Sequence, residues 1–352
     1  MRVKIFGAGS IGNHMAYAFR TKGFEVHVCD NDIEALTRME MNIYPERYGK
    51  WDSKIKLYES SNAPIGGFDI IIIGTPPESH LDIAFSVLKE NPGGLLIEKP
   101  LTYPFNDDLK KFYDLSKNVK TKIFIGYNHV VSSSIQKLNN LLKENIIGEI
   151  LSIDVNFREN WDGIFKAHPW LDGPKDSYLG FYNKGGGATC EHSHAINMWQ
   201  HLSKMCNKGR ILKVSSLLKF SEEDNINYDS IALVNVTTEK KLIGRIVQDV
   251  VTKPHEKIAK IIGNEGTIEW FCNFTPSMDK IILSRFNEEP QSIDFPKTRN
   301  DDFLQEINYL INELKNPGKY IDINLKNGYE TMKVIEGIFQ SHQDQEIVNI
   351  DY

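Results

Sequence analysis

The fold is decided by the stretch Val3-Lys4-Ile5-Phe6-Gly7-Ala8-Gly9-Ser10-Ile11-Gly12, near the start of this chain of 352 residues. The short apolar run that ends at Gly7 predicts a buried strand, and apolar residues at helical spacing from Ile11 to Lys22 predict a helix. Glycines in the pattern G-x-G-x-x-G between a strand and a helix are typical of a turn that approaches the pyrophosphate of a dinucleotide. The first glycine allows the tight turn, the second keeps the path of the phosphates clear, and the third lets the helix pack on the sheet.

Strands and helices alternate over the first 126 residues. Further strands are predicted at residues 26–29, 70–73, 95–97 and 122–125, and further helices at residues 32–41, 78–90 and 106–116. This alternation predicts an α/β fold with a doubly wound parallel sheet, that is, a Rossmann dinucleotide-binding domain.

The residues that follow these strands form the expected cofactor site, because ligands of such sheets bind at the carboxyl ends of the strands. Asp30 follows the second strand at a spacing from Gly12 that suits a carboxylate on the adenosine ribose. Because Asp30 repels a 2′-phosphate and no arginine follows it directly, NAD is favoured over NADP. The alternative is an ordinary turn with Asp30 as a helix cap. The predicted cofactor-binding residues are Gly7, Gly9, Ser10, Ile11, Gly12, Asp30, Thr75, Pro76, His80, Glu98 and Asn128.

Lys99 stands in the sequence Glu98-Lys99-Pro100, directly after the strand at 95–97. Pro100 disfavours a helical conformation of Lys99 and so holds it extended at the sheet edge. A partly desolvated lysine beside a nicotinamide can exchange a proton with a substrate hydroxyl. The alternative is a surface lysine at an ordinary strand end.

After residue 126 the pattern changes, which gives two predicted domains, residues 1–126 and 127–352. Helices are predicted at residues 132–144, 188–202, 302–314 and 329–340, which makes the second domain α+β. Strands that mostly lack intervening helices predict a large, open and mainly antiparallel sheet; they lie at residues 151–157, 211–218, 231–236, 242–251, 258–262, 267–270 and 281–283.

The long irregular stretch from residue 160 to 187 is rich in aromatic and hydrogen-bonding side chains. Long loops in compact domains are usually functional, and aromatic rings beside donors and acceptors suit a sugar or a polyol. The alternative is a loop that its aromatic side chains pin to the core. The predicted substrate-binding residues are Lys99, Asn128, Trp161, His168, Trp170, Tyr178, Tyr182, His192 and His194.

The predicted helix at 188–202 carries Glu191 and His194 at the spacing i,i+3, which places them on one face. Glu191 can then orient the His194 imidazole or carry a proton itself. The neighbouring Cys190 and His192 suggest a metal, but these side chains cannot all point one way on a helix. No HExxH or CxxC pattern occurs either, so no metal site is predicted.

The composition sets further limits. With 41 Lys and Arg against 47 Asp and Glu, the net charge of −6 gives no reason to expect nucleic acid or an anionic membrane as a partner. The four cysteines are scattered, which fits a reducing compartment. Without a signal-peptide pattern or an apolar run of membrane-spanning length, the chain is expected to be cytoplasmic.

Four segments together resemble the Gfo/Idh/MocA family of glucose–fructose oxidoreductase and inositol dehydrogenase-like oxidoreductases. They are GAGSIG at residues 7–12, GTPPESH at 74–80, EKPL at 98–101 and GGGATCEHSH at 185–194. The resemblance implies a Rossmann domain and an α/β domain whose large open sheet often forms the oligomer interface, so a homodimer or homotetramer is expected. It also implies that Lys99, His194 and Glu191 are catalytic. Glu191 stands where many members have aspartate, which points to a differently shaped pocket.

The residues and the resemblance together predict an NAD(P)-dependent oxidoreductase. The expected reaction transfers a hydride between nicotinamide and a secondary hydroxyl or ketone of a sugar, a sugar derivative such as a nucleotide sugar, or a cyclic polyol. Two alternatives stay open: a dinucleotide-binding regulator without turnover, and an enzyme of the same class that acts on an imine or a tetrapyrrole. The presence of both Lys99 and His194 favours an enzyme, since a sensor does not need this pair.

Overall fold

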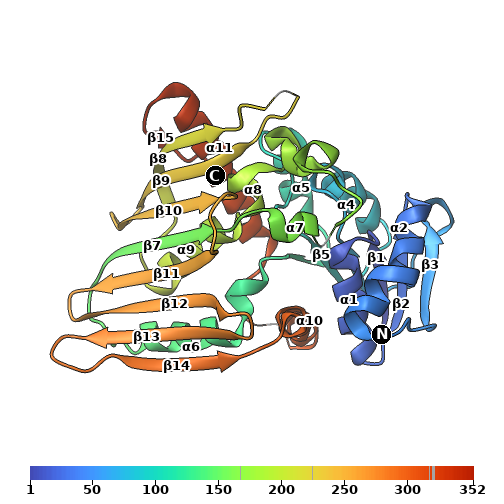
Figure 1. Ribbon diagram of the computed structural model, residues 1–352, viewed down its shortest axis with the longest axis horizontal. Helices are drawn as coiled ribbons and strands as arrows, with labels where there is room; N and C mark the ends of the chain where they lie inside the picture. The colour runs from blue at the N-terminus through green and yellow to red at the C-terminus, as the bar shows by residue number, and fades with distance from the viewer. Residues whose placement is uncertain (167, 224, 317, 319–321) are drawn as a thin grey trace. The chain divides into compact units, whose positions relative to one another are not determined.

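The computed structural model describes residues 1–166, 168–223, 225–316, 318 and 322–352 (Figure 1). Its internal contacts divide the chain into two units. The first consists of Met1–Thr102, Asn106–Asn128 and Asn300–Lys326, and the second of Tyr103–Phe105, His129–Arg299 and Asn327–Tyr352. The predicted division after residue 126 stays a prediction, and the segment from 300 to 326 joins the first unit in the structure.

The first unit contains a six-stranded sheet in which all strands are parallel, with the order β3-β2-β1-β4-β5-β6. This confirms the predicted Rossmann sheet. Every residue of β4 and β5 is buried, as expected of central strands covered on both faces. The strands are β1 (Arg2–Phe6), β2 (Glu25–Asp30), β3 (Ile55–Glu59), β4 (Ile70–Ile73), β5 (Gly94–Ile97) and β6 (Lys122–Ile125).

Helices connect these strands and begin close to the predicted positions. They are α1 (Ser10–Thr21), α2 (Ile33–Arg38), α3 (Tyr44–Tyr48), α4 (His80–Leu88) and α5 (Asp108–Ser116), with a π-helical turn at Met39–Ile43. Single 3₁₀ turns lie at Ser60–Asn62, Pro77–Ser79, Asn128–Val131, Pro174–Asp176, Tyr178–Gly180 and Tyr182–Lys184.

Helix α10 (Arg299–Lys315) packs in the first unit although it lies far along the chain. The ring of Phe303 stacks on His14 of α1 with 4.3 Å between the centroids. Beyond the helix, the carbonyl oxygen of Ile323 accepts a hydrogen bond from the N–H of Ile125 in β6 at 2.8 Å. The late segment therefore completes the edge of a sheet that the beginning of the chain builds.

The second unit contains a nine-stranded sheet with the order β14-β13-β12-β11-β7-β10-β9-β8-β15. All pairs are antiparallel except β7 with β10, which confirms the predicted, mainly antiparallel sheet. The strands are β7 (Ile150–Arg158), β8 (Ile211–Phe220), β9 (Asp229–Thr238), β10 (Ile243–Asp249), β11 (Glu256–Gly263), β12 (Gly266–Thr275), β13 (Met278–Arg285), β14 (Gln291–Pro296) and β15 (Val348–Asn349).

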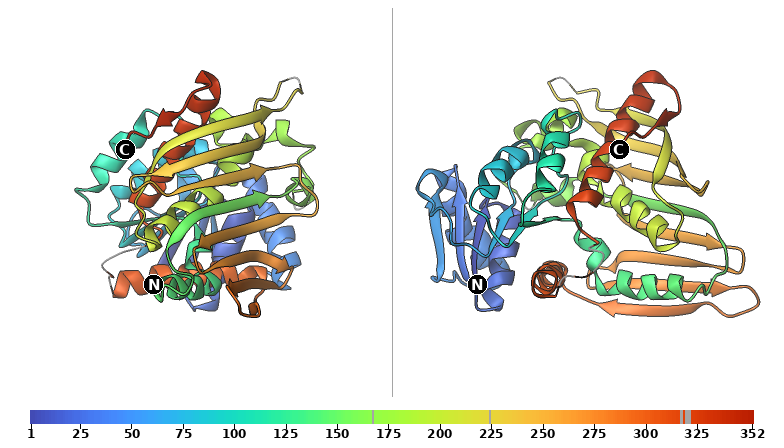
Figure 2. Two further views of the ribbon diagram at one scale, coloured as in Figure 1. Left: turned by 90° about the vertical axis from the view of Figure 1, so that its left-hand side faces the viewer. Right: turned by 180° about the vertical axis from the view of Figure 1, so that it is seen from behind.

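Helices α6 (Ser133–Lys143), α9 (His194–Met205) and α11 (Leu325–Asp344) lie against one face of this sheet (Figure 2). Trp199 of α9 is fully buried there and donates a hydrogen bond from its indole N–H to the carbonyl oxygen of Ile153, at 2.9 Å. On the opposite face, Leu217, Leu233 and Ile243 are exposed. Among the described residues, no helix is both long and apolar enough to cross a membrane.

The predicted single helix at 188–202 is wrong, because the structure has two helices there. Helix α8 (Gly187–Glu191) ends before His192, and α9 begins at His194. The side-chain amide of Gln248 donates to the carbonyl oxygen of His192 at 2.7 Å and to those of Ala188 and Thr189 at 3.3 Å and 3.2 Å, which stabilises the irregular turn between the two helices. Glu191 and His194 therefore belong to different helices rather than to one helix face.

Candidate active site

The glycine turn between β1 and α1 has the shape that a dinucleotide requires. A side chain at Gly7, where φ is +101°, would come within 2.6 Å of the Gly74 carbonyl oxygen, and one at Gly12 within 1.9 Å of the Gly7 carbonyl oxygen. In front of Gly9 the space is open to at least 4 Å. Ser10 and Ile11 begin the first turn of α1, where backbone N–H groups have no partner inside the helix. An anionic pyrophosphate fits this cradle of N–H groups at a helix N-terminus.

Asp30 lies beside the glycine turn at the end of β2. One carboxylate oxygen accepts a hydrogen bond from the N–H of Ala8 at 2.7 Å, and the other accepts from the N–H of Asp32 at 2.9 Å. A carboxylate has about four acceptor positions, so capacity for ribose hydroxyls remains. The cap of α2 is Asp32, whose side chain accepts from the N–H of Glu34. The alternative interpretation of Asp30 as the helix cap therefore does not apply.

His80 joins the loops that follow β4 and β5. The ring is fully buried, with Nε2 2.7 Å from the carbonyl oxygen of Thr75 and Nδ1 3.0 Å from that of Pro100. Burial lowers the pKa of His80 to about 4, so the ring is neutral at physiological pH and donates to only one of the two carbonyls. This geometry favours a role in holding Thr75 and Pro100 over direct contact with a cofactor.

Lys99 emerges directly after β5 and is half-buried. The carboxylate of the preceding Glu98, a buried residue, accepts a hydrogen bond from the N–H of Lys99 at 3.3 Å. A side chain at Gly126 would come within 2.8 Å of that carboxylate. Gly126 is thus a supporting residue of this site that the sequence analysis missed, although a glycine directly after the last parallel strand was a visible sign.

Asn128 is the last residue of the segment Asn106–Asn128 of the first unit, and its side chain is largely buried. Within the described part of the chain, its side-chain oxygen has no hydrogen-bond partner. Buried polar atoms are rarely left without a partner, so this oxygen is suited to a donor on a bound ligand.

The second unit brings together two pairs of side chains around the break between α8 and α9. The hydroxyl of Tyr178 donates to a carboxylate oxygen of Glu191 at 3.4 Å. His194, the first residue of α9, lies against His129 with 4.5 Å between the ring centroids. His129 directly follows Asn128 but is not one of the predicted site residues.

The other predicted substrate residues have different surroundings. Trp161 is buried in an apolar cluster with Leu179 and Tyr228, which is the core role weighed as the alternative. Nδ1 of His168 lies 2.7 Å from the carbonyl oxygen of Ile164, within hydrogen-bond distance. Trp170 is 40% exposed, and its ring meets that of His168.

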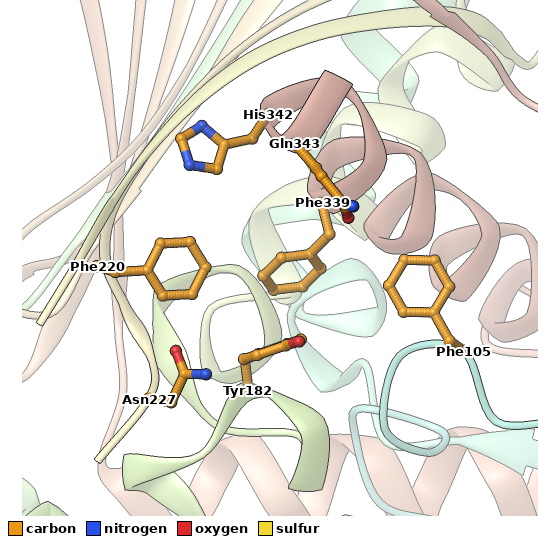
Figure 3. Close-up of a pocket in the computed structure, with 7 residues that line it drawn as sticks. All are labelled: Phe105, Tyr182, Phe220, Asn227, Phe339, His342 and Gln343. Carbon is orange, nitrogen blue, oxygen red and sulfur yellow. The ribbon is translucent and has the colours of Figure 1, made fainter. Parts of the chain in front are cut away.

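His192 and Tyr182 make contacts of another kind. His192 is buried, and its carbonyl oxygen accepts from Gln248. Tyr182 lines an open pocket of about 340 Å³ on the second unit, where several aromatic rings face a common space (Figure 3). The other lining residues are Phe105, Phe220, Asn227, Phe339, His342 and Gln343.

Gly187, the first residue of α8, lies against a buried carboxylate. Asp229 is fully buried and accepts hydrogen bonds from the N–H of Thr189 at 2.8 Å and from its hydroxyl at 2.7 Å. A side chain at Gly187, where φ is +81°, would come within 2.1 Å of the other carboxylate oxygen. Burial raises the pKa of Asp229 to about 7. Asp229 therefore anchors the short helix that carries Glu191.

In the part of the chain that the structure describes, no group of three or more His, Cys, Asp or Glu side chains could hold a metal ion.

Two family models match the chain. Residues 1–127 match the one described as "Oxidoreductase family, NAD-binding Rossmann fold", and residues 139–350 match "Oxidoreductase family, C-terminal alpha/beta domain".

Known proteins resemble the chain over its whole length. It is 21% identical over 368 aligned positions to glucose-6-phosphate 3-dehydrogenase of Bacillus subtilis (strain 168), covering 99% of this chain and 98% of that protein. The structure of levoglucosan dehydrogenase with NADH superposes with a TM-score of 0.80 at 14% identity, covering 100% of this chain and 99% of the other. That of the WlbA dehydrogenase from Bordetella pertussis with NADH and UDP-GlcNAcA gives 0.74 at 18% identity, with the same coverage. At these identities the structural likeness shows the fold.

Proposed function

The chain belongs to the Gfo/Idh/MocA family of oxidoreductases, and we propose that it is an NAD-dependent dehydrogenase acting on a secondary hydroxyl of a sugar or sugar derivative. The observation that carries this proposal lies within one unit. The open glycine cradle at Gly9 and the half-buried Lys99 both follow carboxyl ends of parallel strands in the same sheet. Support for a sugar comes from the relatives, which are named for glucose 6-phosphate and levoglucosan or hold UDP-GlcNAcA.

The residues of the first unit divide the work of holding the cofactor. The N–H groups of Ser10, Ile11 and Gly12 bind the pyrophosphate, since they lie at the N-terminus of α1, which is the positive end of the helix dipole. Asp30 accepts the ribose hydroxyls and, through its charge, favours NAD over NADP. Thr75, Pro76, Glu98 and Asn128 line the nicotinamide half. Bound NAD supplies the acceptor for the hydride that leaves the substrate carbon.

Proton transfer falls to the chain's own side chains. Lys99 accepts the proton of the substrate hydroxyl while the hydride leaves, and returns it in the reverse direction. His194 is the second acid/base group, and Glu191, held by Tyr178, stands where the family commonly has aspartate. The exposed ring of Trp170 is suited to stack on a sugar ring, whereas Trp161 serves the core.

The variant Lys99→Met tests this assignment, because methionine keeps the length of the side chain and removes the proton acceptor. We expect turnover to fall by about 10²- to 10⁴-fold, the scale of acid–base catalysis, while binding of NADH is nearly unchanged. Turnover is measured by NADH absorbance with inositols, free sugars, uronates and nucleotide sugars. Binding is measured by NADH fluorescence.

The matched control is Lys89→Met, which removes an exposed lysine at the end of α4. This variant is expected to turn over substrate like the wild type. Unchanged turnover in Lys99→Met would reject the assignment of Lys99. A wild-type protein that binds NADH but oxidises none of the compounds would favour the regulator instead.

A further inference from the structure

Two backbone hydrogen bonds interrupt the helical pattern between α8 and α9. In a continuous α-helix each N–H bonds to the carbonyl oxygen four residues earlier. Instead, the N–H of Ser193 bonds to the carbonyl three residues earlier, that of Cys190, at 3.1 Å. The N–H of Ala195 likewise bonds to the carbonyl of His192, at 2.8 Å. The carbonyl oxygen of Thr189, which Ser193 would reach in a continuous helix, accepts from a different donor.

That donor is the side-chain amide of Gln248. Its nitrogen lies 3.2 Å from the carbonyl oxygen of Thr189, 3.3 Å from that of Ala188 and 2.7 Å from that of His192. One amide group therefore bonds to carbonyls on both sides of the point where α8 ends. The orientation of this amide is fixed, because its own oxygen in the same place would face three other oxygens.

Gln248 is held by the sheet. It lies in the interior strand β10, between Phe157 of β7 and Ala232 of β9. The residue has no exposed surface, and within the described part of the chain its side-chain oxygen has no hydrogen-bond partner. Leaving a buried polar atom without a partner costs free energy, so an apolar side chain would suit this place better if packing alone mattered. The NH₂ group is the part of Gln248 that the turn requires.

We propose that Gln248 is a positioning residue that acts through this turn: by fixing the carbonyls on both sides of the end of α8, it sets the directions in which the side chains of Glu191 and His194 leave the two helices. Glu191 ends α8 and His194 begins α9, so each lies within two residues of a carbonyl that Gln248 holds. The inference rests on the proposed function, in which these two side chains serve proton transfer. A misplacement of about 1 Å in such a group is enough to slow turnover by about 100-fold.

The variant Gln248→Met removes the three hydrogen bonds and keeps the length of the side chain. We expect kcat with the sugar substrate to fall by about 10- to 100-fold, while the affinity for NADH, whose proposed site lies in the first unit, stays nearly the same. NADH absorbance measures kcat, and NADH fluorescence measures the affinity. Gln200→Met is the matched control, since Gln200 is a buried amide on α9 whose oxygen accepts from the hydroxyl of Thr331. This control should keep the kcat of the wild type.

The variant Gln248→Glu separates positioning from packing, because glutamate has the same shape as glutamine. An ionised carboxylate has no donor and repels the three carbonyl oxygens, whereas the protonated form has one O–H group to donate. Burial raises the pKa of such a carboxyl above its usual value. Relative to the wild type, the kcat of Gln248→Glu should therefore fall as pH rises from about 5.5 to about 8, while that of Gln248→Met keeps a constant ratio. This variant also keeps the test available if Gln248→Met does not fold.

A measurement without turnover keeps the inference apart from the proposed function. Histidine labelled with ¹³C at Cε1 gives one NMR signal per ring, and the spectrum of His194→Gln assigns the signal of His194. We expect this signal to move in both Gln248 variants and to stay in place in Gln200→Met.

Wild-type kcat in Gln248→Met, or an equal loss in Gln200→Met, overturns the inference. So does a relative kcat of Gln248→Glu that does not change with pH, or a His194 signal that stays in place in both Gln248 variants. Loss of folding in both variants would assign Gln248 to stability and reject the inference as well. If the wild type binds NADH but oxidises no sugar, the proposed function fails, and the His194 signal alone decides the role of Gln248.

Discussion

Asp30 illustrates how a single carboxylate can serve the fold and a ligand together. Its two oxygens hold the N–H groups of Ala8 and Asp32, so the charge is fixed beside the glycine turn before any ligand arrives. A fixed charge discriminates between ligands more sharply than a mobile one, because no reorganisation is needed on binding.

Replacing Asp30 by serine should therefore reduce the preference for NAD. The substitution removes both the acceptor for the ribose hydroxyls and the charge that repels a 2′-phosphate. We expect the ratio of kcat/KM for NAD to that for NADP to fall by about tenfold or more, as a loss of one charged interaction implies. The measurement is a comparison of initial rates with the two cofactors.

The control is Asp32→Ala, which removes the cap of α2 but leaves Asp30 in place. It should cost about 1 kcal/mol of stability and leave the cofactor ratio unchanged. An unchanged ratio in Asp30→Ser would mean that Asp30 does not bind the ribose.

Residues of the site could be predicted from the sequence where one local pattern carries them. The glycine turn is such a case, since its three glycines, the strand and the helix are contiguous. Gly126 and His129 could not be predicted in this way. A side chain at Gly126 would clash with the carboxylate of Glu98, and His129 is notable only because its ring lies beside that of His194. Those relations arise only when distant segments have folded together.

At the scale of elements too, features set by local sequence could be predicted, whereas features set by distant residues could not. Local apolar spacing placed α1, α4, α6 and α10 to within a few residues. The break between α8 and α9 was missed because its cause, the amide of Gln248, lies 56 residues along the chain from His192. Strands β3 and β14 were missed because polar and partly exposed residues interrupt their apolar pattern.

The anchoring of α8 makes stability depend on pH. The pKa of Asp229 is about 7 in the folded protein against 3.8 for an unperturbed aspartate, so the folded state binds the proton more tightly. The free energy of unfolding should therefore fall as pH rises from about 4 to about 7. Three pKa units correspond to at most about 4 kcal/mol for this buried group.

The variant Asp229→Asn tests this dependence, since asparagine is neutral and can still accept from Thr189. Relative to the wild type, its free energy of unfolding should increase steadily between pH 4 and pH 7. Urea unfolding at several pH values measures the difference. Glu222→Gln, which removes an exposed acid, should show no such trend. A constant difference between Asp229→Asn and wild type would contradict the prediction.

At the scale of the whole molecule, one face of the nine-stranded sheet carries exposed apolar side chains. Leu217 and Leu233 are direct cross-strand neighbours on β8 and β9, and they are 61% and 44% exposed. Leu233 in turn pairs with Val247 on β10. A row of apolar side chains on an open sheet is typical of an interface between copies of a chain.

We expect the protein to be a homodimer or homotetramer through this face, and Leu233→Asp to dissociate it. Light scattering after size exclusion should give the monomer mass of 40.3 kDa for the variant and a multiple of it for the wild type. The control is Leu115→Asp, which changes an exposed leucine on α5 of the first unit. A wild type that already elutes as a monomer would refute this expectation.

The return of residues 300–326 to the first unit has a consequence for how the protein is made. During synthesis, the nucleotide-binding sheet leaves the ribosome early, yet the residues that complete it, including Phe303 and Ile323, are translated almost last. Most of the second unit is therefore synthesised before the β6 edge of the first unit's sheet can be covered. A gene fragment that stops after residue 128 would therefore yield an aggregation-prone polypeptide rather than a free-standing cofactor-binding module.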